Sequence, residues 1–81
     1  MTQLQVLLFA SYAEAFGTSA VTVTVSEPAT SADVVAALRS LPGGAVLPAT
    51  PVVAVDRRYV RGAVAVRAGQ EIALIPPVAG G

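Results

Sequence analysis

Only one stretch of this 81-residue chain has the apolar spacing of a full helix. Between Ala32 and Leu41, four apolar side chains fall on one helical stripe, and Pro42-Gly43-Gly44 stops the helix behind them. Thr30 or Ser31 can accept hydrogen bonds from the first free amides as the N-cap, and Asp33 suits the positive end of the helix dipole. The core must therefore combine strands with a single main helix.

The remaining apolar segments are short and carry the alternation or the β-branched bias of strands. In Ala20–Ser26, for example, three valines occupy one face and two threonines the other. Ser11–Phe16 is too short for a full helix and predicts a single helical turn or a tight loop, while Gly62–Ala68 is ambiguous. We expect strands at Leu4–Ala10, Ala20–Ser26, Val52–Val55, Tyr59–Arg61 and Glu71–Ile75.

This order of elements predicts an α+β fold. We expect a mixed sheet of about five strands, with the main helix packed across one face and the last strand returning beside the first. Such an arrangement is the β-grasp, or ubiquitin-like, fold. Residues 1–75 are expected to form the β-grasp domain, and residues 76–81 an extended functional C-terminal tail.

The composition leaves the domain with few of the side chains that enzymes use for catalysis. The chain has no Cys and no His, and all five of its cations are arginines, so it has no Lys either. These absences exclude disulfides, thiolate metal sites, the commonest general base and the amine nucleophile. The carboxylates are scattered without the spacing of an acid-base pair. We expect no metal site and no cofactor bound by the domain itself.

The net charge and the hydropathy of the chain limit the classes of partner and the cellular location that we expect. A formal net charge of zero disfavours nucleic acid as a partner. The apolar runs are too short for a membrane-spanning helix, and no basic segment of a secretory signal precedes them, so we expect a cytoplasmic protein without membrane association. Arg57, Arg58 and Arg61 form the only local basic cluster, which we interpret as a solvated turn, with a contact to an acidic partner surface as the alternative.

The C-terminal segment Pro76-Pro77-Val78-Ala79-Gly80-Gly81 combines a rigid start with a narrow end. The two prolines favour an extended course, and the side chains then shrink from Val78 to Ala79 to two glycines. Such an arm fits a channel too tight for a Cβ atom. Because the sequence ends at Gly81, its carboxylate is the expected working group, whereas Gly43-Gly44 is internal and offers none.

A terminal carboxylate is a poor electrophile until it is activated. Adenylation by a partner enzyme with ATP would convert Gly81 into an acyl phosphate anhydride, and a sulfur nucleophile could then displace AMP. The product, a thiocarboxylate, carries reactive sulfur without a cysteine. This chemistry fits a domain that lacks Cys, His and Lys, because the acid-base groups come from partner proteins.

Several segments of the chain resemble the small subunits of molybdopterin synthase, the sulfur carriers of molybdenum-cofactor biosynthesis. The specific match is Gln70–Gly81, which resembles that family's turn, apolar strand and Pro-Pro-Val-x-Gly-Gly ending. The resemblance covers nearly the full length. Its supporting matches are Val6–Ala10, Glu14 with Gly17, and Val53–Asp56 before the strand at Tyr59.

The resemblance implies a β-grasp fold, and it implies that separate partner proteins activate the tail, supply the sulfur and receive it. An E1-like enzyme would adenylate Gly81 with ATP and magnesium, a sulfurtransferase would supply the sulfur, and the tail would enter the large synthase subunit. In an assembly of two large and two small subunits, two carriers would give both dithiolene sulfurs to cyclic pyranopterin monophosphate. The active-site groups would lie on the large subunit, and Phe9, Tyr59 and Ile75 of this chain would bind it.

Two positions depart from that family, and three alternatives stay open. Ala13 stands where many members have a basic residue, and Gln70 where many have Asp. The alternatives are a sulfur carrier for thiamine-thiazole or another thiocarboxylate pathway, a ubiquitin-like modifier joined through Gly81 to lysines, and a binding module whose tail is incidental. Pro76-Pro77 favours the molybdopterin pathway, because the thiazole carriers usually lack this brace.

Overall fold

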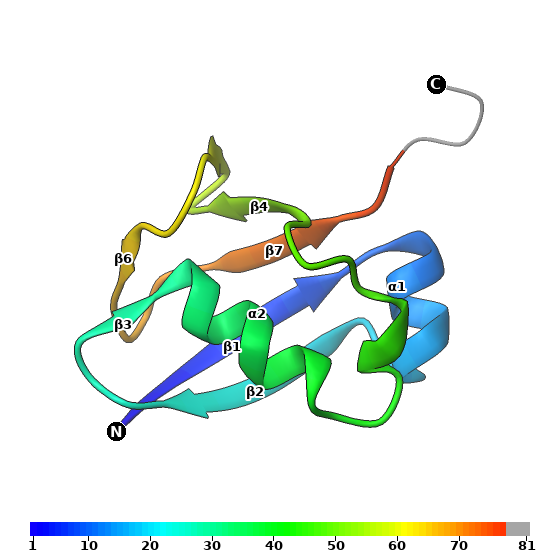
Figure 1. The fold of residues 1–81 in the computed structure, drawn as a ribbon, viewed down its shortest axis with the longest axis horizontal. Coiled ribbons are helices and arrows are strands. Elements are labelled where there is room, and N and C mark those ends of the chain that lie inside the picture. The colour runs from blue at the N-terminus through cyan, green and yellow to red at the C-terminus, as the bar shows by residue number, and fades with distance from the viewer. Residues whose placement is uncertain (78–81) are drawn as a thin grey trace.

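The computed structural model describes residues 1–77 of the chain. This part contains two short sheets, two helices and one 3₁₀ turn (Figure 1). In chain order the elements are β1 (Thr2–Leu8), α1 (Ala10–Phe16), β2 (Ala20–Val25), β3 (Ala29–Thr30), α2 (Ser31–Arg39), η1 (Gly44–Val46), β4 (Val52–Val55), β5 (Arg58–Val60), β6 (Ala65–Val66) and β7 (Ile72–Ile75).

The main sheet has five strands in the order β2-β1-β7-β4-β5. The first and last strands, β1 and β7, lie side by side in parallel, and the other neighbours in this sheet are antiparallel. Helix α2 crosses one face of the sheet, in front of β1 and β2 in Figure 1. The predicted fold class is confirmed: the chain is an α+β protein with the β-grasp arrangement.

The core forms between α2 and the face of the sheet that it covers. Strand β1 alternates between buried and exposed residues, with Leu4, Val6 and Leu8 at most 2% exposed. Residues Ile72 and Leu74 of β7 pair with Val6 and Leu8 and are fully buried as well. The predicted helical stripe is confirmed at Val34, Val35 and Leu38 of α2, which belong to the same core.

The ends of α2 explain its length. Thr30 is the N-cap: its Oγ1 accepts from the Asp33 amide at 3.3 Å, and the Asp33 carboxylate accepts from the Thr30 amide at 2.8 Å. This reciprocal capping box resolves the choice between Thr30 and Ser31. The helix ends at Arg39, so the predicted end at Leu41 was wrong, and Leu41 lies outside the helix with 38% of its surface exposed.

Helix α1 is longer than the single turn or loop predicted for Ser11–Phe16. It begins at Ala10, directly after Phe9. Strand β1 therefore ends at Leu8 and not at the predicted Ala10. Tyr12 is 4% exposed and anchors the helix in the core. Gly17, in the left-handed conformation, closes its C-terminus. The helix forms because of this packing, which its seven residues do not indicate alone.

A second sheet of two strands, β3 and β6, was not predicted. It gives a structure to part of the ambiguous segment Gly62–Ala68. Ser31, 3% exposed, holds this segment to the start of α2: its Oγ donates to the Gly62 carbonyl at 3.2 Å and accepts from the Val64 amide at 3.1 Å. Within residues 1–77, neither helix is long and apolar enough to cross a membrane.

The turn between β4 and β5 is braced by a carboxylate. Asp56 and Arg57 both have positive φ angles, 51° and 70°, as a two-residue hairpin loop requires. The two Asp56 carboxylate oxygens accept from the Glu71 amide and from Gln70 Nε2, each at 3.0 Å. The Glu71 amide, and after it the Gln70 side chain, hold the pKa of the Asp56 carboxyl below its ordinary value.

We expect Gly44→Ala to lower the free energy of unfolding by about 1–3 kcal/mol. Gly44 is buried, and a Cβ atom there would meet the Leu38 carbonyl and the Arg39 backbone at the end of α2. Urea denaturation would measure the loss. The matched control is Ala45→Ser at the exposed neighbouring position, which should stay within about 0.5 kcal/mol of the parent. Equal midpoints for the Gly44 variant and the parent would contradict the close contact.

The Asp56 brace should make stability depend on pH in one direction. Because its folded pKa is lowered, its contribution is complete above about pH 4, the value for a free Asp, and is lost as the pH falls through the folded pKa. We expect the urea midpoint of the parent to fall more steeply on acidification than that of Asp56→Asn. Glu14→Gln, exposed on α1, serves as the control and should follow the parent. Parallel curves for the parent and Asp56→Asn would exclude this role.

Candidate functional site

The predicted tail begins at the centre of the main sheet. Strand β7 is the middle strand of five and ends at Ile75, which pairs with Val52 of β4. Pro76 and Pro77 follow directly and end the ladder, since proline has no amide hydrogen to donate. The other predicted tail residues, Val78, Ala79 and Gly80, and the predicted reactive residue Gly81, lie outside the described residues.

The three predicted partner-binding residues lie on one face of the sheet, opposite to α2. Tyr59 pairs with Ala54, and Ala54 with Ala73, so these side chains point to the same side, away from the core. Ile75 alternates with buried Leu74 and therefore shares that side. Phe9 has an extended backbone and lies one residue beyond Leu8, the partner of Leu74, so it falls beside Ile75 on this face.

These residues belong to a larger apolar surface, which we call the outer patch. Tyr59 is 75% exposed, Val52 50% and Phe9 46%, while the small residues Ala54 and Ala73 lie between them in the sheet and are only 6% and 7% exposed. Three large apolar side chains exposed on one face of a small domain make that face a candidate interaction site. The members of the outer patch are Leu7, Phe9, Val52, Ala54, Tyr59, Ala73 and Ile75.

The outer patch differs in chemistry from the rest of its face. The neighbouring positions toward β2 are polar, namely Gln3, Gln5 and Thr22. The seven members of the patch are all uncharged, and one of them, Ile75, directly precedes Pro76. A partner that covers the patch would therefore lie at the point where the tail leaves the sheet.

The sequence did not identify four members of the patch, Leu7, Val52, Ala54 and Ala73. Alternation places Val52 on the same face as Ala54, but the register that brings Val52 opposite Ile75 is visible only in the structure. Leu7 likewise meets Ala73 through the parallel pairing of β1 with β7. The strand pairing that places them on a shared face was the missing information.

The two departures from the resembled family have clear positions. Ala13 is half-buried on α1 and packs against the core. Gln70 is a turn residue, as predicted: its Oε1 accepts from the Arg67 amide at 2.7 Å, and its Nε2 donates to the Asp56 carboxylate. Gln70 therefore supports the turn before β7.

The part of the chain that the structure describes contains no cluster of metal-ligating side chains. Its polar groups serve the fold: the Asp33 carboxylate caps α2, and the Asp56 carboxylate braces the β4–β5 turn.

Comparison with known proteins identifies the family of the chain. A model of the ThiS family matches residues 6–81. The crystal structure of SAMP1 from Haloferax volcanii is 31% identical, with a TM-score of 0.83 over 98% of this chain and 99% of that one. No curated protein sequence matches the chain.

Two more distant structures share the fold. Subunit 1 of a molybdopterin converting factor from Pyrococcus furiosus is 19% identical, with a TM-score of 0.80 over 96% of this chain and 100% of that one. A complex of subunits 1 and 2 of the corresponding factor from Helicobacter pylori contains a chain that is 17% identical, with a TM-score of 0.71 over 99% and 100%. The family match extends over almost the whole sequence, from Val6 to Gly81, and the chain therefore belongs to the ThiS family of ubiquitin-like sulfur carriers.

Proposed function

We propose that this chain is the sulfur-donating small subunit of a molybdopterin synthase. The observation that carries the proposal is the continuity between the outer patch and the tail: Ile75 belongs to the patch and is followed directly by Pro76-Pro77. A large subunit bound to the patch receives the tail at the edge of the contact. The six tail residues, 76–81, reach roughly 20 Å when extended, and this length limits how far the active site of the large subunit can lie from the end of β7.

The proposed reaction takes place at Gly81. Its carboxylate oxygen attacks the α-phosphorus of ATP on an E1-like enzyme, and pyrophosphate leaves. Hydrosulfide (HS⁻) delivered by a sulfurtransferase then attacks the carbonyl carbon, AMP leaves with the C–O electron pair, and loss of the sulfur-bound proton leaves Gly81 as a thiocarboxylate. ATP and magnesium belong to the activating enzyme, since the chain has no Cys, His or Lys with which to promote these steps.

The proposed acceptor of the sulfur is cyclic pyranopterin monophosphate, bound by the large subunit. Two carriers, in an assembly of two large and two small subunits, provide the two dithiolene sulfurs. Two observations support this pathway. The ending Pro76-Pro77-Val78-Ala79-Gly80-Gly81 resembles that of the synthase small subunits. The H. pylori structure is a complex of subunits 1 and 2 of a molybdopterin-converting factor, and this chain has a similar fold.

A ubiquitin-like modifier is the second candidate. It is favoured by the higher identity, 31% and 29%, to two structures of SAMP1 from H. volcanii, one of them described as a small archaeal modifier protein. In this case the activated Gly81 carbonyl is attacked by a lysine amine of a target protein, and an isopeptide bond replaces the thiocarboxylate. A thiazole-pathway carrier is a third outcome, since the matching model is that of the ThiS family.

We expect deletion of Gly81 to abolish sulfur transfer and leave the fold unchanged, because the tail follows the last strand. The parent protein, charged by its activating enzyme, should show by intact mass the exchange of one oxygen for sulfur. With the large subunit and the pterin precursor it should form molybdopterin. The matched control is Ala68→Ser at an exposed position in the turn before β7, which keeps the tail intact and should retain transfer.

Three results would separate the candidates. Molybdopterin formation by the protein without Gly81 would refute the proposal. A charged parent that is inactive with the large subunit, but active in thiazole synthesis, would move the chain to that pathway. Gly81-linked adducts on lysines, without any thiocarboxylate, would identify a modifier.

We expect Tyr59→Ala to weaken the complex with the large subunit about tenfold or more, because a large aromatic side chain that becomes buried at an interface contributes strongly to affinity. Tyr59 is 75% exposed, so the change should spare the fold. Isothermal titration calorimetry would measure the affinity. The control is Val46→Ala. Val46 lies on η1, which packs against α1 and α2, and its side chain is 49% exposed and away from the outer patch. Equal losses for the two variants would argue against the outer patch as the interface.

A further inference from the structure

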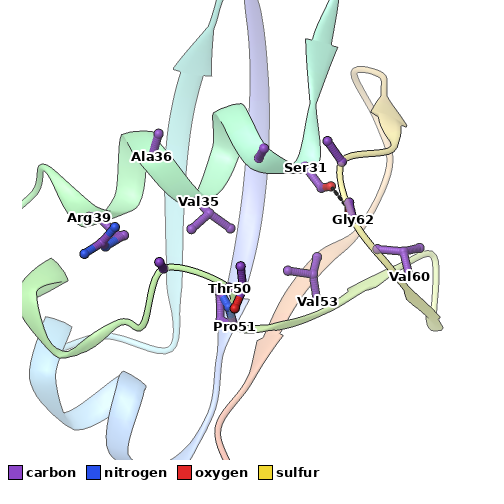
Figure 2. A pocket seen from close by; sticks show the side chains of 12 residues that line it. Ser31, Val35, Ala36, Arg39, Thr50, Pro51, Val53, Val60 and Gly62 are labelled. Carbon is purple, nitrogen blue, oxygen red and sulfur yellow. Dashed lines mark hydrogen bonds between the residues drawn. The ribbon is translucent and has the colours of Figure 1, made fainter.

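A groove lies on the opposite side of the sheet from the outer patch, between α2 and the β4–β5 hairpin (Figure 2). Helix α2 packs chiefly over β2, and so leaves the core-facing side of β4 and β5 partly uncovered. The resulting space has a volume of about 250 Å³. Its apolar walls are Val35 and Ala36 of α2, Val53 of β4, Val60 of β5, and Pro51.

The two ends of this groove differ. At one end, the hydrogen bond from Ser31 Oγ to the Gly62 carbonyl fixes the start of α2 to the segment after β5 (Figure 2). At the other end, Arg39 is the charged residue that lines the groove, and it is exposed. The groove is therefore a preformed apolar channel with a cation at one mouth.

Two arginines lie on this side of a protein whose net charge is zero. Arg39 of α2 lines the groove, and Arg58 of β5 lies two residues before Val60 and so on the same face of the sheet. Among residues 1–77, neither of these two forms an ion pair, whereas the nearby Arg57 is bound to Glu71 at 3.8 Å. No carboxylate lines the groove in the described part of the chain. The charge pattern therefore favours a ligand that carries carboxylates.

Strand β5 also offers unpaired backbone groups. It is the outermost strand of the main sheet, and in the described structure it pairs with β4 alone. Alternate amide and carbonyl groups of such an edge strand point away from its neighbour and can pair with an added strand. Val60 lies on β5 and also lines the groove, so an extended chain at this edge could reach the groove with a side chain.

We propose that the groove between α2 and β5 binds an extended acidic peptide segment of a partner protein, with an apolar side chain placed between carboxylates. The apolar side chain enters the space between Val35 and Val60, and the carboxylates meet Arg39 and Arg58. The peptide backbone adds to the edge of β5. Because the sheet separates this groove from the outer patch, such a partner can bind while the patch and the tail are engaged elsewhere.

The test is an NMR titration of the ¹⁵N-labelled full chain with the synthetic peptide acetyl-Glu-Asp-Val-Ile-Val-Asp-Glu-amide. Amide shifts should change along residues 32–39 and 58–63, which line the groove and its edge. Arg39→Glu should weaken binding about fivefold or more, because an attraction becomes a repulsion. Arg67→Glu makes the same change of charge in the turn after β6 and should bind as the parent does. Unchanged dispersion of the spectra would show that both variants are folded.

Four outcomes would overturn the proposal. The first is the absence of shift changes at saturating peptide, and the second is their location on the outer patch, at Phe9 and Tyr59. The third is equal binding of a peptide with serines in place of the apolar residues or lysines in place of the acidic ones. The fourth is the same set of shifts with inorganic phosphate alone, which would mean a simple anion site. Each readout is independent of sulfur transfer, so the result stands whether or not the proposed function holds.

Discussion

The parallel pairing of β1 with β7 is the contact on which the rest of the structure depends. It joins the two ends of the described chain, with Val6 opposite Ile72 and Leu8 opposite Leu74 at the centre of the sheet. The four side chains are at most 2% exposed. Since every other element lies between these strands in sequence, their pairing closes the core around α2. It also decides where the chain leaves the sheet, next to Ile75.

The strand alternation then gives the sheet two surfaces with different properties. The hairpin of β4 and β5 contributes to both: Val60 faces the groove beside α2, and Tyr59, its neighbour, belongs to the outer patch. Helix α2 protects only part of the inner face because it packs toward β2. The sheet therefore has two separate surfaces that α2 does not cover, the outer patch and the groove.

The sequence was sufficient for elements whose stability is local. The alternation of β2 and the capping residues of α2 are readable from the residues themselves, and β4 has the predicted bounds. Helix α1 and strands β3 and β6 were missed because tertiary contacts hold them, such as the burial of Tyr12 and the bonds of Ser31. Phe9, Tyr59 and Ile75 came from a resemblance, while Val52 needed the strand register. The prediction for Gly81 lies outside the described residues.

The charged groups show why the two surfaces should respond differently to salt. Among residues 1–77, the carboxylates of Asp33 and Asp56 are used in capping and bracing, and Glu27 and Glu71 form ion pairs. The arginines beside the groove have no such partners there, so their field extends into solvent and is screened within about 10 Å at 0.1 M salt. Binding at the groove should therefore weaken as salt rises. Binding at the uncharged outer patch depends on buried apolar area and should not weaken as salt rises. The salt dependence of binding therefore distinguishes the two contacts in one complex.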